Sequence, residues 1–237
     1  MKVVVSPHLD DALFSAWHLL AGAGDVRVVN VFTGMPAEGT VPPRWDRLTG
    51  ARDSVQRMRE RLDEDGRALG LAGRTAVGLD FLDSQYRDGP VDAGALEAAL
   101  EDAAGGAELV APAGIGEHSD HVAVRDAALA LVARGAPVSF YAELPYATEF
   151  GWPAWVDASE PDPFVDPDAY WSDAWAPLFD AHYAPIPIEL DEETQRRKIE
   201  AMREYRTQFP ALEGGDRQRL THPTLVRYEV LFVQRTA

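Results

Sequence analysis

The sequence predicts an α/β fold in which helices cover both faces of a mostly parallel sheet. Two observations support this fold class. Short apolar segments alternate with longer segments of helical periodicity through the first 145 residues, an order that is typical of parallel strands joined by crossover helices. In addition, 46% of the 237 residues are hydrophobic, which is sufficient for the core of a single domain.

The expected elements follow one another in a regular order. Strands are expected at residues 2–7, 26–34, 75–81, 108–114 and 138–144, helices at 11–20, 52–70, 94–104 and 121–135, and a final helix and strand at 191–209 and 227–234. The helix at 52–70 is highly charged, with an apolar stripe formed by Val55, Met58, Leu62 and Leu69. In sheets of this kind, ligands bind beyond the carboxyl ends of the strands.

Residues 151–187 interrupt this alternation within the single domain predicted for 1–237. The segment is rich in proline and holds four of the six tryptophans. Long irregular insertions often carry function, so it could be a substrate lid or recognition loop. It could equally be a packing arm or an oligomer contact, and the sequence leaves both interpretations open.

Charge and composition narrow the classes of partner and compartment. Acidic residues outnumber basic ones by 39 to 22, giving a net charge of −17, which disfavours nucleic acid and anionic membranes as main partners. The absence of cysteine excludes disulfides and thiolate metal sites. The chain begins directly with an apparent strand and has no membrane-length apolar run, so we expect a cytoplasmic protein.

The first candidate motif is the segment "PHLDD" at residues 7–11, where a strand ends and a helix begins. A tight turn can bring His8 and Asp11 together, whereas Asp10 cannot easily point to the same place as its neighbour. One carboxylate could therefore bind a metal while the other acts on a bound water. The alternative is a helix cap, because aspartate favours the first turn, but a cap does not account for the histidine.

The second candidate motif is "EHSDH" at residues 117–121, at the entry to a helix. His118 and His121 are three positions apart and could face one site. The intervening Asp120 could orient an imidazole through its second nitrogen. Here too a capped helix is the alternative, with Ser119 or Asp120 as the cap and the histidines in solvent.

Considered together, the two motifs indicate a catalytic metal site. Both follow strands whose carboxyl ends form the crevice of a parallel sheet. Two nitrogen ligands, one oxygen ligand and no sulfur suit zinc with one position open for water, although iron, cobalt or manganese could also bind. Zinc would lower the pKa of that water and a free aspartate could take its proton, so the predicted chemistry is hydrolysis.

These motifs resemble those of the PIG-L/LmbE family of metal-dependent de-N-acetylases. The family signature P-H-P-D-D-E corresponds here to Pro7-His8-Leu9-Asp10-Asp11-Ala12, and its H-P-D-H corresponds to His118-Ser119-Asp120-His121. The segments "RLDEDGRALGLAG", "LDFLDSQYR" and "KIEAMREYRTQF" resemble further parts of the family. The resemblance reaches about residue 209, leaves 151–187 unmatched, and implies a Rossmann-like three-layer α/β/α domain.

The resemblance also implies a role for each matched residue. It assigns the metal ligands to His8, Asp11 and His121, and the general base to Asp10. It makes His118 an acid or electrostatic partner, which stabilises the oxyanion or protonates the leaving amine, while Asp120 holds a histidine in place. Arg61 and Asp83 correspond to family positions near the substrate and could contact sugar hydroxyls, or each could be an ordinary surface or salt-bridge residue.

Three departures from the family pattern affect these roles. Ala12 replaces a supporting glutamate, and Leu9 and Ser119 replace prolines. Some members have a tyrosine that helps to polarise the amide carbonyl two residues before the second motif, where this chain has Gly116. Any such help must come from elsewhere, and the tyrosines and His182 of the insertion are candidates.

The implied activity is the removal of acetate from an N-acetylated amino sugar of the N-acetylglucosamine type. The substrate would be a small glycoconjugate or secondary metabolite, and a homo-oligomer is possible. A non-catalytic ligand-binding or regulatory protein that retains the fold is the alternative, motivated by Ala12 and Gly116. A nucleotide-binding protein is disfavoured, because the turn after the first strand has no G-x-G-x-x-G.

Overall fold

The computed structural model describes residues 1–160, 164–179 and 182–235. Residues 161–163 and 180–181 of the predicted insertion therefore lie outside the described part of the chain. One cluster of buried hydrophobic side chains extends from Val3 in the first strand to Phe232 in the last and includes Trp171 of the insertion. Within the described residues, no helix combines the length and the apolar character that crossing a membrane requires.

A seven-stranded sheet forms the centre of the fold, in the order β3-β2-β1-β4-β5-β7-β6. Its strands are β1 (Lys2–Ser6), β2 (Val26–Asn30), β3 (Ala76–Gly78), β4 (Glu108–Pro112), β5 (Val138–Tyr141), β6 (Tyr183–Glu189) and β7 (Tyr228–Gln234). The first five strands pair in parallel, whereas β7 is antiparallel to both of its neighbours. The predicted mostly parallel α/β sheet is confirmed.

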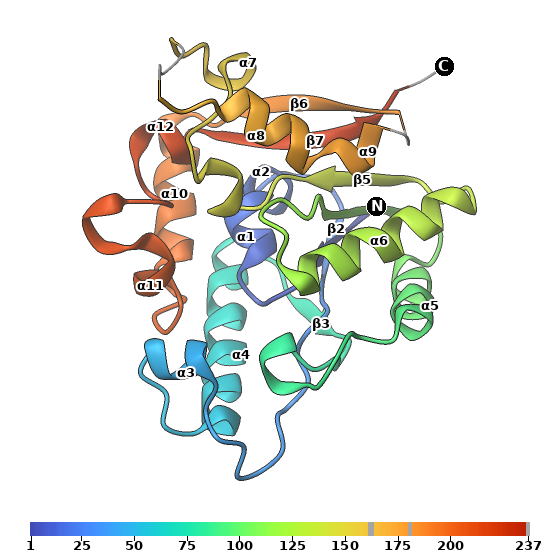
Figure 1. Ribbon diagram of the computed structural model, residues 1–237, viewed down its shortest axis with the longest axis vertical. Coiled ribbons are helices and arrows are strands. Elements are labelled where there is room, and N and C mark those ends of the chain that lie inside the picture. Colours follow the sequence, from blue (N-terminus) through green and yellow to red (C-terminus); the bar gives the residue numbers. More distant parts are fainter. Residues whose placement is uncertain (161–163, 180–181, 236–237) are drawn as a thin grey trace.

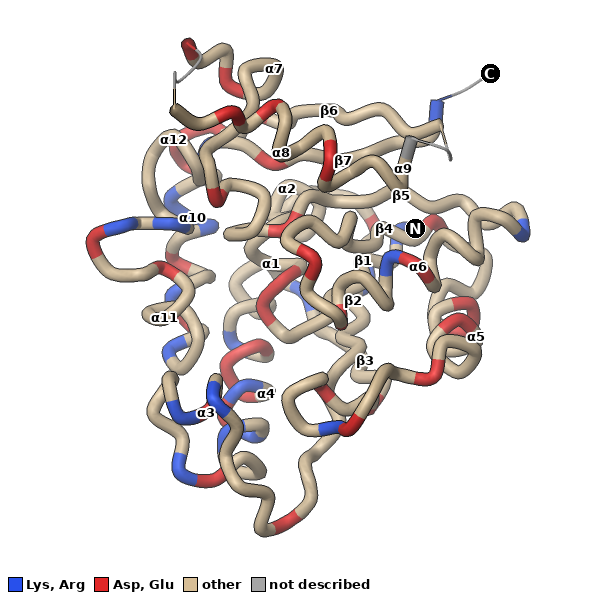
Figure 2. The backbone as a smooth tube through the Cα atoms, viewed as in Figure 1, with Lys and Arg blue, Asp and Glu red and all other residues tan. Residues whose placement is uncertain are grey.

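Helices cover the sheet on both faces, as predicted (Figure 1). On one side lie α4 (Ser54–Leu71) and α10 (Glu192–Met202), which contact each other, and on the other side lie α5 (Ala93–Ala104) and α6 (Ser119–Ala133). The shorter helices are α1 (Asp11–Ser15), α2 (Trp17–Leu20), α3 (Arg44–Leu48), α7 (Ala154–Asp157), α8 (Pro167–Ala174), α9 (Ala176–Phe179), α11 (Phe209–Glu213) and α12 (Pro223–Val226). Lysine and arginine gather mainly around α3, α4, α10 and α11 and are interspersed with acidic residues (Figure 2).

The single helix predicted at 11–20 is in fact two helices, α1 and α2, separated at Ala16. The carboxylate of Glu229 in β7 accepts hydrogen bonds from the backbone N–H groups of Trp17 and His18, at 2.9 and 3.0 Å. This carboxylate satisfies donors at the start of the second helix, as an N-cap side chain would. Since it comes from the far end of the chain, the local sequence gave no sign of the break.

The apolar stripe predicted for α4 is only partly correct. Met58 and Leu69 are buried, but Leu62 is 39% exposed. The buried face of the helix instead includes Arg61 and Asp65, both at most 5% exposed. These charged side chains are buried because Arg61 borders the site described below and Asp65 bonds with neighbouring polar groups.

The insertion at 151–187 contains more regular structure than predicted. It holds α7, α8 and α9, and its last residues begin β6 at the edge of the sheet. Pro185 and Pro187 lie within β6, and prolines in a strand are characteristic of such an edge. The rings of Trp171 and Trp175 pack on Phe232 of β7, with centroids 6.2 and 5.1 Å apart, so the insertion is packed against the antiparallel part of the sheet.

Candidate metal centre and active site

The sheet brings the two sequence motifs together at the carboxyl ends of adjacent strands. Strands β1 and β4 are paired in parallel, and the first motif follows β1 while the second precedes α6, after β4. The turn after β1 is closed by Ser6, whose hydroxyl donates to the His8 carbonyl and accepts the N–H of Ala12 at 2.8 Å. The turn thereby holds His8 beside the first turn of α1, where Asp11 lies.

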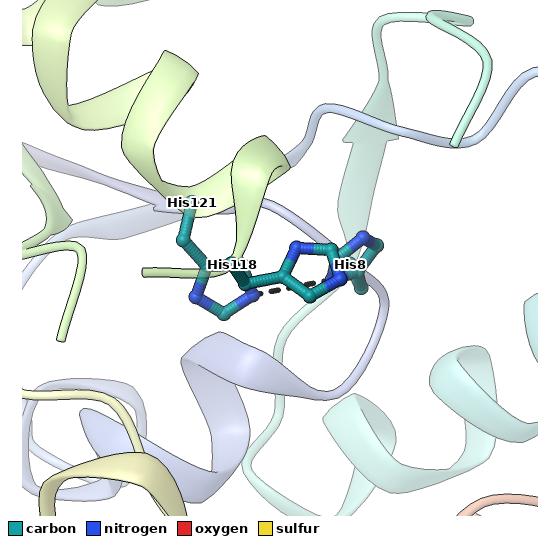
Figure 3. Close-up of side chains that lie close together, drawn as sticks. All are labelled: His8, His118 and His121. Carbon is teal, nitrogen blue, oxygen red and sulfur yellow. Dashed lines mark hydrogen bonds between the residues drawn. The ribbon is translucent and has the colours of Figure 1, made fainter. Parts of the chain in front are cut away.

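Three side-chain atoms from the motifs form a nearly equilateral triangle. His8 Nδ1 lies 3.3 Å from Asp11 Oδ2 and 3.2 Å from His121 Nε2, and the last two atoms are 3.2 Å apart. Figure 3 shows the imidazoles of His8 and His121 facing each other, with His118 beside them. Zinc with ligands at about 2.0–2.1 Å in a tetrahedron requires neighbouring ligand atoms about 3.3–3.4 Å apart, so the triangle has the dimensions of one tetrahedral face.

The charges around this triangle favour a cation. Although burial opposes protonation, the carboxylates around His8, that of Asp83 foremost, raise its pKa well above the usual range. Against the same effect of burial, Asp11 raises the pKa of His121 to about 9. The pKa of Asp11 is lowered well below its usual range, mainly by His121, despite its burial. The carboxylates that favour the protonated imidazoles of His8 and His121 would also stabilise a divalent cation.

The outward nitrogen of each imidazole is held by a carboxylate. Asp120 Oδ2 lies 3.1 Å from His8 Nε2, and Glu143 Oε1 lies 3.2 Å from His121 Nδ1. A carboxylate on one ring nitrogen places the proton there and leaves the other nitrogen free as a ligand. Asp120 is expected from the sequence to hold a histidine in place. In the structure its carboxylate contacts the ring of His8, not that of the nearby His118.

Glu143 is a site residue that the sequence interpretation missed. Its carboxylate is fully buried and also accepts the backbone N–H groups of Gly114 and Ile115, at 2.7 and 3.3 Å. It follows β5, the strand next to β4. A charged residue at the carboxyl end of a buried strand was the available signal, because such ends form the crevice of the sheet.

Other side chains near the triangle also offer possible ligand atoms for a metal ion. A nitrogen of His118 lies within 4.8 Å of nitrogens of His8 and His121, and a second group of such atoms comprises His8, Asp83 and Asp120. In the second group the carboxylates already have cationic partners. Arg61 lies 3.4 Å from Asp83, and Arg87 pairs with Asp120. The triangle with Asp11 is therefore better suited to a cation than this second group.

Asp10 lies next to the triangle in the same turn and lines the adjacent cavity. Its side chain is buried, and burial and the neighbouring Asp11 carboxylate raise its pKa, against the opposing effect of Arg61. A raised pKa makes a carboxylate a stronger base. The position and the pKa suit a group that takes a proton from water.

The geometry of His118 indicates a neutral hydrogen-bond donor. Its Nδ1 accepts the backbone N–H of Asp120 at 3.3 Å as the N-cap of α6, which leaves the proton on Nε2. Burial, His8 and His121 lower the pKa of His118 to about 4. Near neutral pH this imidazole can donate a hydrogen bond from Nε2 without carrying a charge.

A cavity of about 320 Å³ opens beside the two motifs. Arg61 and Asp83, the weaker candidates from the sequence, both line it, as do Trp45, Gln208 and Tyr146. None of the described residues of the insertion is among those lining the cavity, and His182 is exposed elsewhere. The described part of the insertion therefore packs against the sheet and does not line this cavity.

Comparison with known proteins identifies a family whose model spans both motifs. The family model PIG-L, described as GlcNAc-PI de-N-acetylase, matches residues 3–132 and so includes both motifs. A curated relative from Streptomyces fradiae, 2'-N-acetylparomamine deacetylase, is 34% identical over 159 residues. That match covers 61% of this chain and 57% of the relative, so the chain spans little more than half of the relative's length.

Solved structures of two deacetylases have the same fold. One is Dbv21, the deacetylase of the pseudoaglycone of the antimicrobial reagent A40926, which is 28% identical to this chain, with a TM-score of 0.69. A triple mutant of the deacetylase Orf2 in the teicoplanin biosynthetic pathway is 25% identical, with a TM-score of 0.70. Each comparison covers 98% of this chain and 96% of the other.

Proposed function

This chain belongs to the PIG-L family of de-N-acetylases, and from that membership we propose that it is a metal-dependent hydrolase that removes acetate from an N-acetylated amino sugar. The observation that supports this most strongly is the triangle of His8, Asp11 and His121 beside a buried Asp10 carboxylate. Matched relatives are deacetylases by name. The nitrogen and oxygen donors favour zinc, and other divalent transition metals are possible.

The proposed mechanism divides the work among residues of both motifs. A metal held by the triangle would supply Lewis-acid chemistry, lowering the pKa of water and polarising the acyl oxygen. Asp10 accepts a proton as the water oxygen attacks the carbonyl carbon, then delivers it to nitrogen as the C–N bond breaks. His118 donates from Nε2 to the negatively charged oxygen of the tetrahedral intermediate. The products are acetate and the free amine.

We propose that the substrate is an amino sugar carried on a small glycoconjugate or secondary metabolite. The comparisons support this class, because the matched proteins act on acetylated paromamine or on a pseudoaglycone, as their names state. In the cavity wall, Arg61 and Asp83 pair at 3.4 Å and are each 5% exposed. Both offer hydrogen-bonding groups to sugar hydroxyls from fixed positions.

Acetate release from a panel of N-acetylated amino sugars tests this proposal. The panel would include simple N-acetylglucosaminides, an N-acetylated aminocyclitol pseudodisaccharide and a glycopeptide carrying an N-acetylated sugar. We expect stoichiometric acetate and free amine from at least one compound, with loss of turnover after chelation. If the metal-loaded protein binds such compounds but releases nothing from any of them, the non-catalytic alternative replaces the hydrolase.

A further inference from the structure

Gly116 lies two residues before His118, at a place where the ring of Tyr146 excludes any side chain. Its φ of +84° is in the left-handed region, and an added Cβ would lie 2.7 Å from Tyr146 Cδ1 and 2.8 Å from Tyr146 Cβ. Tyr146 comes from a different element, the turn η2 (Tyr146–Thr148) after β5. The glycine therefore leaves space that an aromatic ring from elsewhere in the chain occupies.

The ring of Tyr146 lies directly over the candidate active site. Its centroid is 5.4 Å from the His121 ring, nearly perpendicular to it, and 6.5 Å from the His118 ring. The side chain is half-buried and lines the cavity together with Asp10. Among the described residues, no hydrogen-bond partner is found for its hydroxyl, so that group is available to a ligand.

The insertion holds this turn in place. The hydroxyl of Tyr170 in α8 donates to the Tyr146 carbonyl at 3.1 Å, and the indole N–H of Trp171 donates to the Ala147 carbonyl at 2.8 Å. Trp171 is fully buried, so this second bond is formed away from solvent. Two consecutive residues of the insertion thus bind two consecutive carbonyls of η2, which fixes the backbone that carries the ring.

We propose that Tyr146 is a further catalytic residue, whose hydroxyl donates a hydrogen bond to the carbonyl oxygen of the substrate's acyl group, and that Tyr170 and Trp171 are its positioning residues. This proposal rests on the proposed deacetylase function. A second neutral donor beside His118 would complete a pair that stabilises negative charge on that oxygen. A phenol hydroxyl keeps its proton near neutral pH, so it can donate to that oxygen.

Tyr146→Phe tests the catalytic role with the metal-loaded, full-length protein. Removing one such donor typically lowers kcat by about 10²–10³-fold, and we expect a decrease of that size with little change in KM or metal content. The loss should be smaller with the matched N-trifluoroacetyl substrate, because fluorine already stabilises the charge on oxygen. Tyr228→Phe is the matched control, since Tyr228 lies in β7 and packs against Arg227, away from the cavity.

A double-mutant cycle with Tyr170→Phe tests the positioning role. Tyr170→Phe removes the hydrogen bond to the Tyr146 carbonyl and should let the Tyr146 ring shift slightly. Moving a catalytic group by 1 Å can lower the rate by roughly 10²-fold, and we expect a smaller decrease in kcat than that. In the Tyr146→Phe background the same change should have no further effect, because the hydroxyl that it positions is absent. A purely structural role for Tyr170 would instead give the same loss in both backgrounds.

The outcomes separate this proposal from the function on which it rests. Wild-type turnover in Tyr146→Phe would overturn the catalytic role while leaving the deacetylase function intact. Equal losses on acetyl and trifluoroacetyl substrates, accompanied by lower metal content, would also overturn it in favour of a structural role. A wild-type protein that releases no acetate from any compound would remove both proposals together.

Discussion

The two sides of the candidate active site are built in different ways. On the metal side, His8 and Asp11 follow the end of β1 directly, and His121 lies in the first turn of α6, the helix that follows the neighbouring strand β4. On the side next to the His121 ring, Tyr146 reaches the site from a turn whose backbone is bound by Tyr170 and Trp171 of the insertion. The proposed metal ligands therefore come from short local motifs, whereas the position of Tyr146 depends on contacts between distant segments.

The largest effect should come from breaking the triangle on the metal side. His121→Ala removes one of its three atoms, so we expect the protein to lose both stoichiometric metal and acetate release. Elemental analysis and the acetate assay measure the two losses on the same sample. His182→Ala is the control, since that side chain is exposed and does not line the cavity. Stoichiometric metal in His121→Ala would rule out His121 as a ligand.

A change at Asp10 should separate turnover from metal binding. Asp10→Asn keeps the triangle but removes the base, and general acid–base groups contribute typically about 10²–10⁴-fold to rate. We expect kcat to fall within that range while metal content stays at the wild-type level. Steady-state kinetics on protein of known metal content would show this, and an Asn variant with full activity would disprove the base assignment.

A smaller effect is expected for Glu143, whose carboxylate contacts the proposed ligand His121 but lies outside the triangle. Glu143→Gln weakens the hydrogen bond to His121 Nδ1, and such changes typically lower metal affinity or activity by about 10–100-fold. Competition against a chelator of known affinity measures the change in metal Kd. Asp120→Asn, which alters the equivalent contact on His8, should behave similarly. Unchanged affinity in both variants would contradict the orienting role.

On the side of the insertion, the principal effect should be on stability. Trp171→Ala removes a fully buried indole, and truncating a buried aromatic typically lowers the free energy of unfolding by about 3–5 kcal/mol. Leu62→Ala, at a position 39% exposed, should change it by no more than about 0.5 kcal/mol. Denaturant unfolding compares the two. A Trp171→Ala protein as stable as Leu62→Ala would show that the insertion is not part of the core.

The same contrast explains which features could be predicted from the sequence. The alternation of strands and helices follows from apolar periodicity, and the meeting of the two motifs follows from where parallel strands end. The choice of His8, Asp11 and His121 as the ligand set came from the family resemblance. The carboxylate of Glu229, from the far end of the chain, binds backbone N–H groups where the predicted helix at 11–20 divides in two. The ring of Tyr146 occupies the space that a side chain at position 116 would need. Periodicity and local motifs do not reveal such contacts, because they depend on which distant segments meet.

The insertion was the least predictable part for a further physical reason. Its tryptophans suit a sugar-binding lid and a packed core equally well, since both bury aromatic surface. Only the contacts of Trp171 and Trp175 with Phe232 in β7 distinguish the two. Likewise, Pro185 and Pro187 argue against a central strand but are compatible with the edge position that β6 takes.

Metal removal and return, with acetate release measured at each step, tests the central claim most directly. The protein would be stripped with a chelator, assayed on the best substrate of the panel, and titrated with zinc under the same conditions. We predict that turnover is lost in the stripped protein and returns in proportion to added zinc up to about one ion per chain, as expected for one triangle of ligands. Full acetate release from protein shown by elemental analysis to be free of metal would contradict the account.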